Sequence, residues 1–173
     1  VQSNDYQWTF HIPLNIYSPK INILDYVVMS GADEPGSTVV ISLNIINDGN
    51  LPINNLNLEV VSPTNKINVI DSNINFGIID INQEVSSNLI GDNISLMYND
   101  SIFKGSVFPL QLHFTNTEGY NRTEILNLTV GEIDRFSPVG PDLHGYYIYD
   151  MGDTNYNLAP NFDWVEIDTQ YGG

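Results

Sequence analysis

Apolar and polar residues alternate along most of the chain, from Trp8 to about Val130. Successive side chains of a β-strand point to opposite faces, so this period of two predicts strands that each bury one face. Turn-forming residues separate the segments, and no helix of any length is required. The alternating segments are residues 10–16, 21–23, 39–45, 56–60, 108–114 and 125–130.

The number and spacing of these segments predict an all-β fold. Seven to nine short strands with turns between them are typical of an immunoglobulin-like antiparallel β-sandwich, and a closed barrel is the alternative. The Asn-rich stretch 65–82 predicts one or two edge strands with polar outer faces. An exposed sheet edge of this kind offers a place for assembly.

The composition changes near Gly131. Residues 134–173 hold five of the ten tyrosines and seven acidic residues, against Arg135 as the one basic residue. Chains that stay unfolded are poor in aromatics, so we expect an ordered acidic and aromatic extension that packs on the sandwich or reaches a neighbouring domain. The predicted organisation is a leading strand in residues 1–18, a sandwich in 19–133 and the extension in 134–173.

Charge narrows the classes of partner. The chain has 21 acidic and 5 basic side chains, a formal net charge of −16, and no cysteine. Phosphate backbones and anionic lipid surfaces repel such a chain, so nucleic acid and membrane insertion are not expected. Without cysteine there is no disulfide, thiol nucleophile or zinc–thiolate site. Acidity, scarce Lys and abundant Asn, Thr, Tyr and Gly favour an extracellular or cell-surface location.

Calcium is the one metal that the residues suggest. Asp153, Asn155 and Asn157 have the spacing that begins a calcium loop, but Leu158 and Trp164 replace its glycine and its bidentate glutamate. A less regular site for Ca²⁺ remains open, and the alternative, which we favour, is that these carboxylates are solvated in turns. The candidate ligands are Asp142, Asp150, Asp153 and Asn155.

No pattern in the sequence points to catalysis. His11, His113 and His144 are scattered, and Glu132 with Asp134 follows a strand end, where solvation is expected. Nucleophile-elbow, phosphate-loop and dinucleotide-binding motifs are lacking. We therefore expect a protein that is not an enzyme.

Aromatic residues of the extension form a candidate interaction face for glycan or protein. Alternation would place Tyr147 and Tyr149 on one side of a strand, and Tyr146 and Ile148 on the other. The alternative, which we favour, is that one side packs on the sandwich as a small core. The candidate interaction residues are Tyr146, Tyr147, Tyr149, Tyr156 and Trp164.

Two parts of the chain resemble known modules. Residues 140–150 (Gly-Pro-Asp-x-x-Gly-Tyr-Tyr-x-Tyr-Asp) and 153–167 resemble a connector in large secreted bacterial surface proteins, including multidomain proteins of the gingipain-type C25 peptidase group. Residues 47–50, 76–79 and 128–132 resemble CARDB-like or NEW3-like sandwich domains. The resemblance implies an exported, non-catalytic module. It carries over no peptidase activity, because the chain has no cysteine for a Cys/His dyad.

Together these observations predict a non-catalytic extracellular module that acts as a spacer, docking or adhesion domain. Open strand edges, residues 7–17 or the tail would pair with neighbouring domains, identical subunits or another surface protein, and head-to-tail pairing would build a filament. The alternatives are a carbohydrate-binding module and an accessory domain of a secreted peptidase.

Overall fold

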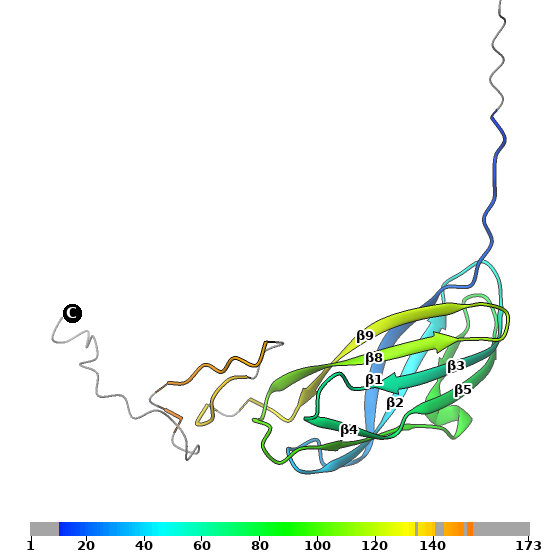
Figure 1. Cartoon of the computed structure of the whole chain (residues 1–173). Coiled ribbons are helices and arrows are strands. Elements are labelled where there is room, and N and C mark those ends of the chain that lie inside the picture. Colours follow the sequence, from blue (N-terminus) through cyan, green and yellow to red (C-terminus); the bar gives the residue numbers. More distant parts are fainter. Residues whose placement is uncertain (1–10, 134, 141–143, 151, 154–173) are drawn as a thin grey trace, which may run out of the picture.

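Nine strands in two antiparallel sheets form the fold (Figure 1), seen in a computed structural model that describes residues 11–133, 135–140, 144–150 and 152–153. The first sheet has the order β1 (Ile21–Gly31), β2 (Thr38–Asn47), β7 (Ile94–Tyr98), β4 (Ile67–Asp71), and β6 (Glu84–Ser86) also pairs with β2. The second has the order β5 (Asn73–Ile79), β3 (Ile53–Val61), β8 (Ser106–Thr115), β9 (Asn121–Val130). A short 3₁₀ turn, η1 (Ser87–Ile90), joins β6 to β7. The predicted all-β antiparallel sandwich is confirmed.

Both sheets turn their apolar faces inward, as the period of two predicts. On β2 the buried apolar side chains are those of every second residue from Val39 to Ile45, and on β8 those of every second residue from Phe108 to Phe114. These faces meet in one core cluster that draws on both sheets. Removing this apolar surface from water is the main force that holds the sheets together.

The Asn-rich stretch forms two edge strands, as predicted. β4 pairs only with β7, and β5 pairs only with β3. Their outward side chains include Asn68, Asn73 and Asn75, while Ile67, Ile74 and Phe76 point into the core. In the described part of the chain no helix is long and apolar enough to cross a bilayer.

Asn47, at the end of β2, is a buried polar side chain with every hydrogen-bonding position used. Its Oδ1 accepts from the backbone N–H of Lys20 and of Gly49, each at 3.1 Å. Its Nδ2 donates to the carbonyls of Leu51 at 2.8 Å and Ile79 at 3.2 Å. One amide thus joins the entry of β1, the turn after β2 and the end of β5 in the other sheet.

The predicted leading strand does not pair in the part that the structure describes. Residues 11–20 form no strand, and Ile12, Leu14 and Ile16 are 85%, 81% and 76% exposed. The residues do alternate, but none of the strands that the structure describes pairs with them to bury one face. This segment leaves one end of the sandwich, and the C-terminal extension leaves the opposite end (Figure 1).

The described part of the extension reverses direction once. Val139 and Ile148 form an antiparallel bridge with two backbone hydrogen bonds, of 3.0 and 2.8 Å. Ser106 donates from its hydroxyl to the carbonyl of Gly140, which holds this turn against β8. The predicted domain boundaries remain predictions.

We predict that Asn47→Asp lowers the free energy of unfolding by about 3 kcal/mol. The new carboxylate oxygen would face the carbonyls of Leu51 and Ile79, where it accepts no hydrogen bond and is buried. Denaturant unfolding measures the change. Asn73→Asp is the matched control, since it adds the same charge at an exposed edge position and should change stability by less than about 0.5 kcal/mol. Equal effects of the two substitutions would contradict this role of Asn47.

Candidate functional site

The predicted calcium ligands are only partly within the described residues. Asp142 and Asn155 lie outside them. Asp153 is buried, and its Oδ2 accepts from the backbone N–H of Asp150 at 2.6 Å, while Asp150 Oδ1 accepts from the N–H of Gly152 at 2.5 Å. Both carboxylates are thus engaged in closing a turn. No group of three His, Asp or Glu side chains that could hold a metal occurs in the described ranges, and the four-residue calcium site stays a prediction.

The tyrosines of the extension divide as alternation predicted. Tyr147 packs edge-on against Phe103 with ring centroids 5.2 Å apart, and it lies 6.1 Å from the ring of Tyr149. On the other side Tyr146 and Ile148 are 71% and 72% exposed. Tyr147 therefore joins the extension to the loop before β8. Tyr156 and Trp164, the remaining candidates, lie outside the described residues.

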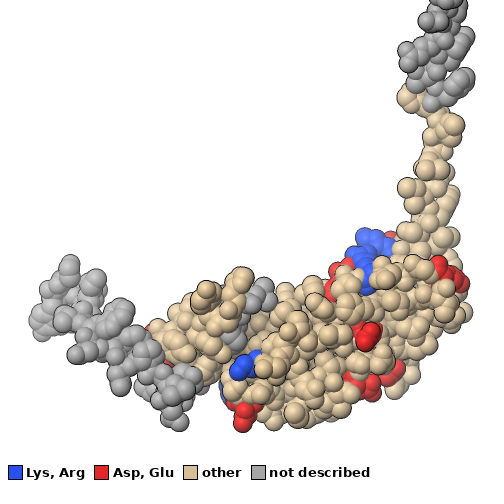
Figure 2. Space-filling model, viewed as in Figure 1, with Lys and Arg blue, Asp and Glu red and all other residues tan. Residues whose placement is uncertain are grey.

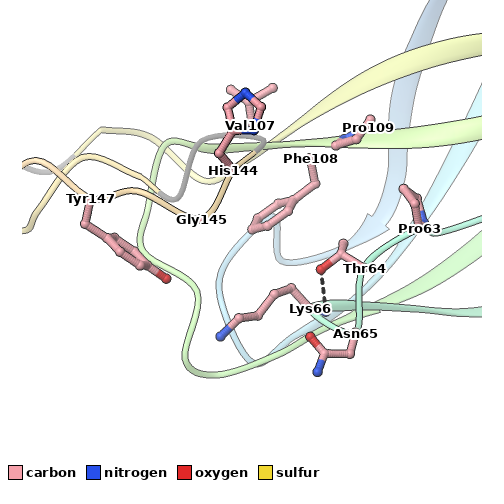
Figure 3. Close-up of a pocket in the computed structure, with 10 residues that line it drawn as sticks. All are labelled: Pro63, Thr64, Asn65, Lys66, Val107, Phe108, Pro109, His144, Gly145 and Tyr147. Carbon is pink, nitrogen blue, oxygen red and sulfur yellow. Dashed lines mark hydrogen bonds between the residues drawn. The ribbon is translucent and has the colours of Figure 1, made fainter.

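A shallow groove of about 700 Å³ lies where the extension meets the end of the sandwich (Figure 3). Tyr147 and His144 form its wall on the side of the extension, and Phe108 and Lys66 line it from the sandwich. Lys66 is committed elsewhere, because its Nζ donates to Ser101 Oγ at 2.8 Å. The described lining of the groove contains no carboxylate.

Two titratable side chains away from the groove, His113 and Tyr98, have contacts within the sandwich. His113 Nδ1 and Thr123 Oγ1 lie 2.9 Å apart across β8 and β9. Tyr98 is buried beside Asp33, and burial, with the nearby Asp33 charge as the second cause, raises the pKa of this phenol well above its usual value. Tyr98 is therefore neutral at physiological pH.

Apart from β6, a three-residue strand that pairs only with β2, the four edge strands of the two sheets differ in how well they are protected from further strands. β4 has five residues, which makes a short edge. β5 and β3 are out of regular register around Gly77 and Asn55, both at positive φ. Near the start of β9, the ion-paired side chains of Arg122 and Glu124 point toward the interior face of the sheet. Short length, bulges and inward charges are the devices by which proteins block strand addition at an edge.

β1 is the fourth edge, and it lacks these protections over its middle. Register shifts occur between Ile23 and Asp25 and between Val28 and Ser30, and the four residues between these two shifts pair regularly with β2. Tyr26 and Val28 point to the same face as the core residues of β2, yet Tyr26 is half-buried and Val28 is 38% exposed. We call residues 25–28 the open edge.

Charged side chains are sparse in residues 11–17 and in the open edge. Residues 11–17 contain no Lys, Arg, Asp or Glu. The open edge has one, Asp25, whose Oδ1 accepts from Asn44 Nδ2 of the adjacent strand. On the face shown in Figure 2 most of the surface is likewise uncharged. An acidic chain thus keeps residues 11–17 free of charged side chains and leaves one, Asp25, in the open edge.

Sequence reasoning did not single out the open edge. The apolar run Val27, Val28, Met29 hides the alternation of β1, because both register shifts move side chains to the other face. A run of adjacent apolar residues in an otherwise alternating sandwich is the signal that could have pointed to an exposed strand.

Comparison with known proteins adds little. No protein-family model matches the chain, and no curated protein matches it. A conjugate transposon protein from Bacteroides vulgatus, solved by NMR in solution, is similar in structure with 16% identity and a TM-score of 0.33. The similarity covers 67% of this chain and 87% of that chain. A similarity this weak says nothing about what the chain does.

We predict that Tyr147→Ala loosens the extension without unfolding the sandwich. Loss of the Phe103–Tyr147 contact removes about 1 kcal/mol. Cleavage by chymotrypsin after Tyr149 should then accelerate roughly fivefold, since cleavage follows the population of the open form. Tyr146→Ala, at an exposed position, is the control and should leave the rate at Tyr149 unchanged. Equal rates in the two variants would show that Tyr147 does not hold the extension.

Proposed function

We propose that this chain is a non-catalytic structural and interaction module of an extracellular or cell-surface protein, and that it binds its neighbours through the open edge of β1. The observation that carries the proposal is that the inner face of residues 25–28 is only partly covered while every other edge is short, bulged or charged.

Strand addition is the binding mode that such an edge supports. An incoming strand gains main-chain hydrogen bonds from the edge, and its alternate side chains fit the partly covered face. The energy comes from completing a sheet and covering apolar surface, so no reactive group is needed. The role is one of spacing and docking.

The arrangement of the chain ends supports a spacer. Residues 11–20 and the extension leave the sandwich at opposite ends (Figure 1). A force applied at one end would therefore be transmitted along the strands to the other end. The contacts of Tyr147 and Ser106 would keep the extension in line with the sandwich.

Composition and resemblance support the surface setting. A chain of −16 with no cysteine and few lysines avoids nucleic acid and anionic membrane surfaces. The resemblance of residues 140–167 to the connector of secreted bacterial surface proteins, and of the sandwich to CARDB-like or NEW3-like domains, favours an exported module in a larger protein.

We predict that Val28→Lys weakens association of the full chain by at least about tenfold. A lysine on the inner face of the open edge puts an uncompensated charge where an added strand would cover apolar surface. Sedimentation velocity over a wide concentration range measures the association. Val27→Lys is the matched control, because it adds the same charge to the outer face of the same strand, where Val27 is 47% exposed. Wild-type association of Val28→Lys, with the fold intact, would overturn the proposed function.

A further inference from the structure

We infer that residues 11–17 of one copy add as a strand to the open edge of a second copy. The inference rests on the proposed function and names both the partner and the segment that it contributes. It joins two features that have no partner within the described residues of one chain, namely an alternating apolar segment without a sheet and a sheet edge without a neighbouring strand.

The donor segment is held at its base so that it points away from the sandwich. Ser18 and Asn50 are joined by hydrogen bonds from Ser18 N–H to Asn50 Oδ1 (2.8 Å) and from Asn50 N–H to the Ser18 carbonyl (3.1 Å). Asn50 Nδ2 also donates to the carbonyl of Ile16 at 3.1 Å. A Cβ at Gly49 would lie 2.5 Å from Lys20 N and Ser18 O, so the close approach at this base requires glycine.

Proline determines which side of the donor segment can pair. In a strand the N–H and C=O groups of one residue point to one side, and those of the next residue to the other. Pro13 has no N–H, so the side that carries Pro13, Asn15 and Tyr17 is the poorer one. The groups of Ile12 and Leu14 lie on the other side and pair with the partner.

The acceptor offers two residues with the matching spacing. The N–H of Ile21 donates to Tyr120 Oη at 3.1 Å and so points away from β2. The partners of Tyr26 and Val28 on β2 each lie an even number of residues from the partner of Ile21 on β2. Because the N–H and C=O groups alternate in direction from one residue to the next, those of Tyr26 and Val28 also point away from β2. Antiparallel pairing of Ile12 and Leu14 with Val28 and Tyr26 would form about four main-chain hydrogen bonds.

The side chains fit the same register. Residues opposite each other in neighbouring strands share a face, so Ile12 and Leu14 would lie on the inner face beside Tyr26 and Val28. There they would extend the core cluster, which Tyr26 and Leu126 already border as partly buried residues. The segment would thus bury the two side chains that the single chain leaves 85% and 81% exposed.

A second copy fits better than the same chain as acceptor. To reach its own β1, the segment would have to reverse direction between Leu14 and Ser18, which would break the hydrogen bonds of Ile16 and Ser18 with Asn50. Charge opposes this contact between copies only through the net charge of each chain. Two chains of −16 repel each other, and the donor segment brings no further acid to the acceptor.

The experiment places a second proline in the donor segment of the full chain. Leu14→Pro removes an N–H that the pairing needs, and association should fall about tenfold or more. Asn15→Pro is the matched control, because its N–H points away from the partner, and it should associate like wild type. Sedimentation velocity measures both, with thermal unfolding to confirm that each sandwich is folded.

Mixing two variants tests whether donor and acceptor lie on different copies. Leu14→Pro keeps the acceptor edge, and Val28→Lys keeps the donor segment, so each alone should remain monomeric while an equimolar mixture forms dimers. A mixture that stays monomeric, although wild type associates, overturns the inference. So does wild-type association of Leu14→Pro, and if Val28→Lys is then still defective, β1 binds another strand and the proposed function stands.

Discussion

The side-chain amide of Asn47 is the interaction on which the position of the other parts depends. It links the entry of β1, the turn after β2 and the end of β5, and these belong to different sheets. Apolar burial alone would let the two sheets slide, because it is not directional. Four hydrogen bonds at one buried point remove that freedom. They also place the base of residues 11–17, since Lys20 is one of the groups held.

A sandwich that buries one face of each sheet still leaves four edges, and each edge must be closed in some way. This chain uses a short strand at β4, bulges at β5 and an inward ion pair at β9. At β1 the bulges stand at both ends of residues 25–28 and leave the stretch between them regular. A protein that merely avoided aggregation would protect this stretch as well, so its openness favours a contact.

Period-two patterning was enough to predict the core, because burial of one strand face imposes the pattern directly, as in Val39 to Ile45. It failed where burial depends on a partner that local sequence does not reveal. Residues 12–16 show the pattern and form no strand, whereas β1 forms a strand and obscures the pattern through its register shifts. The hydrogen bonds of Asn47 could not be predicted either, since 23 asparagines look alike in sequence and only the fold buries this one.

Strand addition between copies would be directional. The donor segment leaves the end of the sandwich opposite to the extension, and the acceptor edge lies along its side. Donor and acceptor are different surfaces, so each copy that receives a strand still has its own to give, and the contact can continue from copy to copy as a ring or a filament. Repulsion between chains of −16 would oppose dense lateral packing, while the donor segment itself adds no charge to this contact. Charge and edge chemistry together thus favour extended assembly over aggregation.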